Sequence, residues 1–275
     1  MALRIVLSVL FIYGSVVLAM FVLQKRFIYM PFRAIEAVPG GFGMTWEEVE
    51  IPLPEGGRLH GWWIPTATPA AGAVLYCHGN GGNISHCLEA AAAWHKDGLA
   101  VLLFDYRGYG QSDGYPGEGK MYADAQAAWD WLVREKRLAP RQILVHGFSM
   151  GGAVAAKVAR DNGPAGLVLQ SPVSSLADAA VRHYPWLPVR ALLLYRYPAA
   201  EFVRTVRCPV AVLHSPTDEV VPYECGRKVF AAAPEPKTFI PLHSGHNDGA
   251  ADLDPAVRAQ LRALARTWLG PVPAK

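Results

Sequence analysis

The sequence predicts an α/β fold with a mostly parallel central sheet and helices on both faces, preceded by one N-terminal transmembrane helix. Apolar strand-like segments alternate with helical segments of roughly ten to seventeen residues, which is typical of βαβ units. Apolar residues make up 52% of the 275-residue chain and charged residues 18%, as expected for one folded domain with a large core. The apolar excess is concentrated in one run near the N-terminus.

That run extends from Ile5 to Leu23 and contains no charged residue. As a helix it would be about 30 Å long at about 1.5 Å per residue, which is the thickness of the bilayer core. Basic residues flank it, with Arg4 before it and Lys25 and Arg26 after it. We therefore expect residues 1–29 to form a single-pass membrane anchor.

The sequence does not determine whether this segment is cleaved or how it is oriented in the membrane. Val17-Leu18-Ala19 resembles the cleavage site of a secretory signal, although the apolar run continues beyond it to Leu23. Basic residues at both ends leave the orientation in the membrane undetermined. If the segment acts only as an anchor, removal of residues 1–28 is expected to release a soluble and active domain.

Residues 30–44 are rich in Pro, Gly and small residues and are expected to connect the anchor to a folded domain at residues 45–270. Within that domain the pattern predicts strands at 45–51, 58–64, 73–77, 99–104, 142–145, 166–169, 209–213 and 237–241. Helices are expected at 85–97, 120–136, 151–160, 225–232 and 255–268. The alternation breaks at residues 171–207, which we interpret as a small cap-like segment, with ordinary connecting structure as the alternative.

The charge and cysteine patterns argue against several classes of function. The net charge is +3, and without a block of Lys and Arg it predicts no nucleic-acid partner. The four cysteines form no CxxC or Cys/His spacing, so neither a metal nor a cofactor is expected. Cys77 and Cys208 lie in or beside apolar runs and are interpreted as buried thiols, while a disulfide stays open as an alternative.

A candidate nucleophile lies in Gly147-Phe148-Ser149-Met150-Gly151, which matches the G-x-S-x-G pattern. A strand-like segment leads directly into it and a small-residue helix follows, so Ser149 is expected at a sharp turn above the sheet. Gly110-Gln111-Ser112-Asp113-Gly114 matches the same pattern, but no strand leads into it and Tyr115-Pro116-Gly117 follows. Ser112 is therefore assigned to a loop.

A serine nucleophile needs a base and an acid, which in this architecture follow it in the order acid, then histidine. His246 lies between the last strand and the last helix, and the preceding Gly245 favours it over its rival His243. Asp218 follows the strand at 209–213 and is expected to orient His246. Three neighbours are assigned other roles: His214 as a packed strand histidine, Glu219 as a solvated helix-start residue, and Asp248 as too close in sequence to His246.

The tetrahedral intermediate of acyl transfer needs backbone N–H donors. One is expected from Met150, the residue after the nucleophile. The other is expected from Asn80, in the glycine-rich loop at residues 78–83. This loop lacks the GK[ST] ending and the G-x-G-x-x-G spacing, so a nucleotide site is not expected.

These motifs in this order resemble the α/β-hydrolase superfamily over about residues 45–270. The matching segments are the loop at 78–83, Asp105 to Ser112, the turn at Ser149, Asp218 to Pro222 and Gly245-His246-Asn247. The chain looks most like the N-terminally anchored branch with a minimal cap, called serine aminopeptidase-like or lysophospholipase-like. Residues 25–31 resemble the basic-aromatic-proline entry of that branch, whereas Ser215 and Ser244 depart from its usual small residues.

The resemblance implies hydrolysis of esters, thioesters or amides, and the membrane location favours acyl or lipid esters as substrates. The first hypothesis is a serine esterase that works through an acyl-enzyme. Alternatives are an acyl-protein thioesterase or serine aminopeptidase with the same triad, and a catalytically silent membrane scaffold. The oligomeric state is left undetermined by the sequence.

Overall fold

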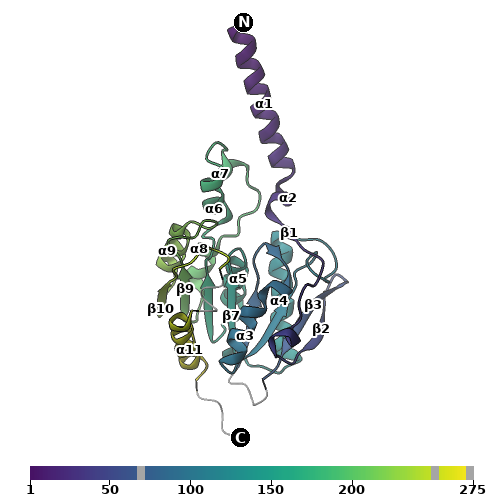
Figure 1. Ribbon diagram of the computed structural model, residues 1–275, viewed down its shortest axis with the longest axis vertical. Coiled ribbons are helices and arrows are strands. Elements are labelled where there is room, and N and C mark those ends of the chain that lie inside the picture. The colour runs from purple at the N-terminus through teal and green to yellow at the C-terminus, as the bar shows by residue number, and fades with distance from the viewer. Residues whose placement is uncertain (67–71, 249–253, 271–275) are drawn as a thin grey trace.

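The computed structural model describes residues 1–66, 72–248 and 254–270, and a single sheet organises most of them (Figure 1). Its eight strands run in the order β10-β9-β8-β7-β4-β6-β3-β2. All neighbours from β10 to β6 pair in parallel, whereas β6 with β3 and β3 with β2 pair antiparallel. The strands are β2 (Glu47–Pro52), β3 (Arg58–Ile64), β4 (Ala73–Cys77), β6 (Ala100–Phe104), β7 (Ile143–Phe148), β8 (Gly166–Gln170), β9 (Val210–His214) and β10 (Lys237–Pro241).

Helices cover both faces of the sheet and bury two separate apolar cores. On one face, α4 (Glu118–Arg134), α5 (Gly151–Asn162) and α9 (Tyr223–Ala232) contribute to the larger core. On the other face, α3 (Leu88–Lys96) and α11 (Pro255–Leu269) pack against the smaller core. The central strands are buried on both sides, which explains why they read as continuous apolar runs and not as alternating ones.

The expected α/β-hydrolase architecture is confirmed, and the differences within the main sheet and its helices concern the ends of elements. β7 continues to Phe148, three residues beyond the predicted end, because its ladder with β8 extends to the pair Phe148 and Gln170. The helix expected at 85–97 starts as a 3-10 turn, Ile84–Cys87, before α3 begins at Leu88. The side chain of Asn83 caps this turn by accepting a hydrogen bond from the Ser85 N–H at 2.8 Å.

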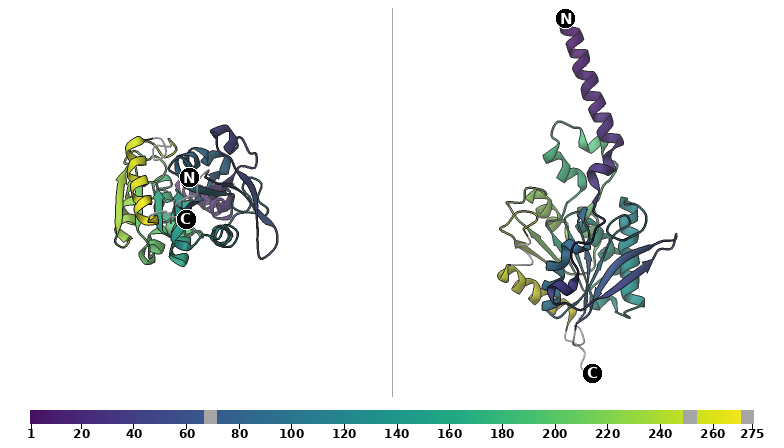
Figure 2. Two further views of the ribbon diagram at one scale, coloured as in Figure 1. Left: turned by 90° about the horizontal axis from the view of Figure 1, so that it is seen from below. Right: turned by 45° about the vertical axis from the view of Figure 1, so that its right-hand side comes forward.

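The N-terminal helix α1 (Ala2–Val22) projects away from the domain, and α2 (Gln24–Ile28) joins it to the domain (Figures 1 and 2). α1 is long and apolar enough to cross a membrane, with a mean hydropathy of 2.6, and none of it is buried. By contrast, Ile28 and Tyr29 belong to the larger core. The removable segment therefore ends before α2, and the expectation that residues 1–28 are dispensable conflicts with this packing.

Residues 30–44 pack against the glycine-rich loop instead of forming a free connector. β1 (Met30–Pro31) pairs in parallel with β5 (Gly81–Gly82), and a 3-10 helix follows at Pro39–Phe42. The amide of Asn83 donates to the carbonyls of Phe32 at 3.0 Å and Ala34 at 2.6 Å. The segment that leaves α2 thus holds the loop in place.

Residues 171–207 lie over the carboxyl ends of the strands, on the same side of the molecule as α1 and α2 (Figure 1). They contain α6 (Leu176–His183), α7 (Val189–Leu192), α8 (Ala199–Phe202) and a 3-10 turn at Val203–Thr205. α6 and α7 stand furthest from the sheet, whereas α8 packs against α5 and α9. We call residues 171–207 the cap segment.

Packing of α11 on the sheet depends on a glycine in β8. A Cβ on Gly166 would lie 2.1 Å from Cε3 of Trp268, a rigid ring in α11. We expect Gly166→Ala to lower the free energy of unfolding by about 1–3 kcal/mol, because the helix must shift to relieve the overlap. Urea unfolding of the full chain in detergent measures this change.

Gly119→Ala is the matched control, since Gly119 is an exposed residue of α4 with no atom within 4 Å of the added Cβ. It should leave stability unchanged or raise it by up to about 1 kcal/mol through helix propensity. Equal unfolding midpoints for the two variants would contradict this account of the packing of α11.

Candidate active site

Ser149 lies at the sharp turn between β7 and α5. Its φ is 54°, which is unusual for a residue with a side chain, and its N–H donates to the Gln170 carbonyl of β8 at 2.9 Å. Two glycines make the turn possible. A Cβ on Gly147 would lie 2.5 Å from the Gly151 carbonyl oxygen, and one on Gly151 would lie 2.2 Å from that of Cys77. The spacing of small residues in the sequence thus has a steric cause.

The structure brings Ser149, His246 and Asp218 together. Nε2 of His246 lies 3.0 Å from Oγ of Ser149, and its Nδ1 lies 2.8 Å from Oδ2 of Asp218. All three side chains are buried. The ring of Phe148 packs against His246 with a centroid distance of 5.0 Å. One imidazole therefore links the hydroxyl to the carboxylate through hydrogen bonds, which is the geometry that general-base activation requires.

The carboxylate of Asp218 is held by several donors. Its Oδ1 accepts hydrogen bonds from the N–H groups of Val220 at 2.9 Å and Val221 at 2.7 Å. Its Oδ2 lies 3.2 Å from Nε2 of His214, in addition to His246. Burial on its own would raise the pKa of Asp218, but the hydrogen bonds from His214, His246 and the Val221 N–H outweigh it, so this pKa lies well below its usual range. The group is therefore a carboxylate at neutral pH.

His214 is buried as expected, but its contact with Asp218 was not foreseen. Its Nε2 lies 3.0 Å from the Val221 carbonyl oxygen, so it approaches both the acid and the loop that holds the acid. Gly226 in α9 gives it room, because a Cβ there would lie 2.2 Å from Nδ1 of His214. Only the position of His214 at the end of β9, four residues before Asp218, could have indicated this role.

The loop that carries His246 is tied to the loop that carries Asp218. The carboxylate of Glu219 accepts the His246 N–H at 3.1 Å. Its assignment as a helix-start residue is wrong, because α9 begins only at Tyr223. Oγ1 of Thr217 donates to the Ser244 carbonyl at 3.1 Å, and Ser215 Oγ in turn lies 2.8 Å from Thr217 Oγ1. The two serines that depart from the family pattern thus take part in this connection.

The rival residues lie apart from the Ser149–His246 pair. His243 is exposed, and Asp248 accepts the Gly245 N–H at 2.7 Å, at the start of the His246 loop. Ser112 is buried in a loop, where its hydroxyl donates to the Asp105 carbonyl at 2.7 Å and accepts the His60 N–H at 2.9 Å. These contacts give Ser112 a structural role.

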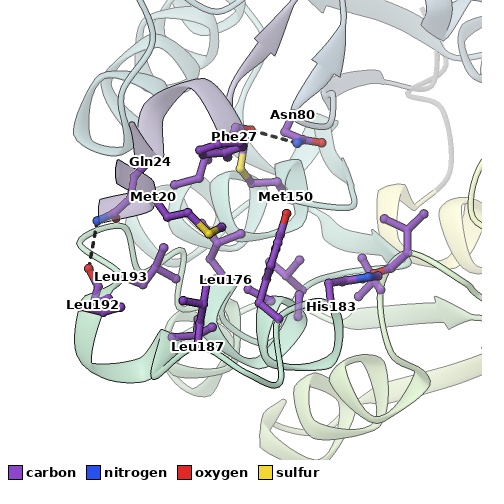
Figure 3. Close-up of a pocket in the computed structure, with 18 of the residues that line it drawn as sticks. Met20, Gln24, Phe27, Asn80, Met150, Leu176, His183, Leu187, Leu192 and Leu193 are labelled. Carbon is purple, nitrogen blue, oxygen red and sulfur yellow. Dashed lines mark hydrogen bonds between the residues drawn. The ribbon is translucent and has the colours of Figure 1, made fainter. Parts of the chain in front are cut away.

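The two expected oxyanion donors flank Ser149. Met150 is the N-cap residue of α5, where backbone N–H groups lack partners within the helix. The carbonyl of Asn80 accepts hydrogen bonds from the Met30 N–H at 3.0 Å and the Tyr109 hydroxyl at 2.8 Å, and its side-chain amide donates to the Ile28 carbonyl at 2.9 Å (Figure 3). Within the described part of the chain no hydrogen bond uses the Asn80 N–H.

A pocket of about 210 Å³ opens beside Ser149 (Figure 3). Its walls come from α1, α2, the cap segment and the loop that carries Asp218, and most of the side chains that line it are apolar. His183 lies on its rim and is within 2.7 Å of the Val220 carbonyl oxygen through Nε2. Aspartate and glutamate are missing from the lining residues that the structure describes. The pocket suits an uncharged, largely hydrocarbon group.

The described residues were compared with the requirements of a metal site and of a reactive thiol. Over residues 1–66, 72–248 and 254–270, no three His, Cys, Asp or Glu side chains are grouped to hold a metal ion. All four cysteines are free thiols, of which Cys77, Cys208 and Cys225 are buried. The pKa of the Cys77 thiol is raised to about 12 by burial, so this group is not a reactive thiolate.

The fold and the motifs define a serine hydrolase, and the chain belongs to the α/β-hydrolase superfamily. A family model described as serine aminopeptidase, S33, matches residues 68–200, which include the glycine-rich loop and Ser149. An uncharacterized protein of Mycobacterium tuberculosis, Rv2307c, is 41% identical over 254 residues, covering 90% of this chain and 89% of that protein.

Two further similarities concern the sequence and the fold, respectively. The lysophosphatidylserine lipase ABHD12 of Danio rerio is 30% identical over 234 residues, covering 75% of this chain and 58% of that protein. The solved structure of the Pyrococcus furiosus esterase Pf2001 superposes with a TM-score of 0.73, covering 88% of this chain and all of that one, at 21% identity. The second similarity concerns the fold.

If Asp218 orients His246, replacing its carboxylate should impair catalysis far more than binding. We expect Asp218→Asn to lower kcat about 10⁴-fold, because an amide at this position favours the wrong imidazole tautomer. Glu219→Gln is the control, since its remaining carbonyl oxygen can still accept the His246 N–H. Steady-state hydrolysis of a chromogenic ester measures both, and similar rates for the two variants would count against this role of Asp218.

Proposed function

We propose that this enzyme hydrolyses carboxylic esters of acyl groups, with lipid esters favoured, through an acyl-enzyme on Ser149. The observation that carries the proposal is the hydrogen-bonded series from Ser149 Oγ to His246 Nε2 at 3.0 Å and from His246 Nδ1 to Asp218 Oδ2 at 2.8 Å. Ser149 is the nucleophile, His246 the general base, and Asp218 the group that fixes the imidazole tautomer and stabilises the imidazolium.

In the first half of the reaction, Oγ of Ser149 attacks the ester carbonyl carbon as its proton moves to Nε2 of His246. The resulting oxyanion would accept hydrogen bonds from the N–H groups of Met150 and Asn80. The tetrahedral intermediate collapses when the C–O bond to the alcohol breaks, and His246 returns the proton to the leaving oxygen. The products are a free alcohol and an ester of Ser149.

In the second half, His246 removes a proton from a water molecule that attacks the acyl carbon. The same two backbone donors would stabilise the second oxyanion. When the bond to Ser149 breaks, Oγ regains a proton from His246 and the carboxylic acid leaves. Asp218 stays ionised throughout, in keeping with its lowered pKa.

The pocket favours acyl groups as substrates. Its lining is mainly apolar side chains, and a hydrocarbon chain there would be removed from water without leaving a buried charge unpaired. The name of the Danio rerio relative, lysophosphatidylserine lipase, supports lipid esters. An acyl-protein thioesterase would use the same site and stays an alternative within this chemistry.

A serine aminopeptidase and a catalytically silent scaffold receive less support from the site. An aminopeptidase would need a partner for the substrate's ammonium group, and the described lining of the pocket contains no acidic side chain. A silent scaffold would not need Ser149 in a conformation with φ of 54° beside a hydrogen-bonded histidine.

We also propose that α1 anchors the enzyme in a membrane. Most of its side chains are exposed and apolar, with Arg4, Ser8 and Ser15 among the exceptions, and such a surface is unfavourable in water and favourable in lipid. The proposed units are an anchor at residues 1–29, a connector at 30–44 and a catalytic domain at 45–270 with its cap segment at 171–207. A cleaved secretory signal is the alternative for the same helix.

Replacing the nucleophile tests the catalytic proposal. We expect Ser149→Ala to lower kcat for short acyl esters by about 10⁶-fold without loss of the fold, because no other group supplies the attacking oxygen. A fluorophosphonate probe should label wild type on the peptide that contains Ser149 and should not label the variant. Ser112→Ala is the control and should stay labelled. Near-wild-type hydrolysis by Ser149→Ala would refute the assignment.

Two truncations test the anchor. We expect the full chain to stay in membranes after alkaline carbonate washing, whereas a chain that starts at Met20 should be extracted and still react with the fluorophosphonate. A chain that starts at Tyr29 should misfold, because it lacks buried Gln24 and Ile28. Extraction of the full chain by carbonate would contradict membrane anchoring.

A further inference from the structure

The pocket beside Ser149 is built partly by the helix that precedes the domain. Met20 and Phe21, at the end of α1, and Gln24, Phe27 and Ile28 of α2 line one side of it (Figure 3). Leu176, Leu187, Leu192 and Leu193 of the cap segment line the opposite side. A helix that only tethered the domain to a membrane would not be expected to line the pocket beside Ser149.

Gln24 fastens the two walls together. Its Nε2 donates to the Leu192 carbonyl at 3.0 Å and its Oε1 accepts the Leu194 N–H at 3.0 Å, while Nε2 also donates to the Phe21 carbonyl at 3.0 Å. The residue is buried, so each bond replaces a lost contact with water. The distance between α2 and the cap segment is therefore fixed at this point.

A second contact lies further along α1. The hydroxyl of Tyr13 donates to the carbonyl of Trp186 at 2.9 Å. Tyr13 precedes Val22, the last residue of α1, by about 14 Å along the helix axis at 1.5 Å per residue. We call the part of the cap segment that contains Trp186 and Leu194 its tip. If α1 spans a bilayer with a core of about 30 Å, this tip reaches into the adjacent leaflet.

The composition of this tip suits such an environment. Trp186 is 48% exposed and Leu194 64% exposed, although both are large apolar residues. A backbone carbonyl in lipid is costly without a hydrogen-bond donor, and Tyr13 provides one for Trp186. Lys25 and Arg26 are exposed at the domain end of α1, at the level where lipid headgroups begin.

The size of the pocket limits what it holds. Its volume of about 210 Å³ lies below the range of roughly 300–1,000 Å³ that is common for ligand pockets, so it suits a narrow hydrocarbon chain better than a bulky ligand. The chain would lie between two apolar walls, one of which continues directly into the bilayer. If the acyl chain of the substrate entered the pocket directly from lipid, it would not have to pass through water.

We propose that Met20, Phe21 and Phe27 form one wall of an acyl-chain subsite, and that the acyl chain enters it sideways from the membrane between α1 and the cap segment. The substrate class is then a membrane-resident ester whose acyl part is one long alkyl chain. This inference rests on the proposed ester hydrolysis at Ser149. It assigns the anchor helix a function in substrate selection.

Substitutions at two neighbouring positions of α1 separate this function from tethering. Met20→Trp places a bulky ring in the pocket. Leu18→Trp introduces the same ring at a position that is 61% exposed and does not line the pocket. The full-length enzyme in phosphatidylcholine nanodiscs is assayed with dodecanoyl and butanoyl esters of one chromogenic alcohol. The readout is the ratio of the two kcat/KM values.

We expect Met20→Trp to lower the dodecanoyl-to-butanoyl ratio by about tenfold, and Leu18→Trp to keep the wild-type ratio. Equal ratios in wild type and both variants would overturn the subsite while leaving ester hydrolysis intact. If wild type hydrolyses neither ester and Ser149 resists fluorophosphonate, the proposed function itself fails and this inference fails with it.

A measurement on the unmodified enzyme covers the case in which Met20→Trp does not fold. A fluorophosphonate whose long alkyl chain ends in a diazirine is attached to Ser149 in nanodiscs and then irradiated. We expect crosslinks to peptides of residues 13–28, accompanied by crosslinks to residues 176–194 on the opposite wall. Crosslinks that leave out residues 13–28 would place the chain against another wall of the pocket, such as Asn80 or Val220 and Val221, and would overturn the proposal.

Discussion

The turn at Ser149 is the constraint on which the rest of the site depends. It requires φ of 54° at a residue that carries a side chain, and it is stabilised by the bond from the Ser149 N–H to Gln170. Gly147 and Gly151 allow β7, α5 and β4 to approach so closely that any Cβ would overlap with backbone. The same turn starts α5 at Met150, so the positions of the proposed nucleophile and of one proposed oxyanion donor have a single cause.

Around this fixed turn, two less regular loops are held by side-chain contacts. Val220, Val221 and His214 position the Asp218 carboxylate, and Glu219 accepts the backbone N–H of His246. On the opposite side, Asn80 joins the glycine-rich loop to Ile28 and Met30. The second proposed oxyanion donor thus contacts the end of α2 and the segment that follows it. The proposed catalytic site and the proposed membrane anchor are thus connected through Asn80.

The sequence predicted those structural features that depend on one short segment of the chain. The strands of the main sheet could be predicted from apolar runs or, for β2 and β3, from an alternating pattern. Ser149 could be separated from Ser112 because a strand leads into only one of the two glycine motifs. The contacts of His214, Glu219 and Gln24 could not be predicted, because each depends on a partner that another element brings close. The position of Met20 and Phe21 beside the pocket was hidden for the same reason, since an apolar helix such as α1 has the same composition whether it faces lipid or a pocket.

The central claim is that the acyl group of an ester is transferred to one hydroxyl. The most direct measurement is mass spectrometry of the full-length enzyme after mixing with an excess of an activated acyl ester and rapid acid quenching. This account predicts a mass increase of one acyl group, located on the peptide that contains Ser149. An enzyme that turns over the ester without such an adduct, or that carries it on another residue, would contradict the account.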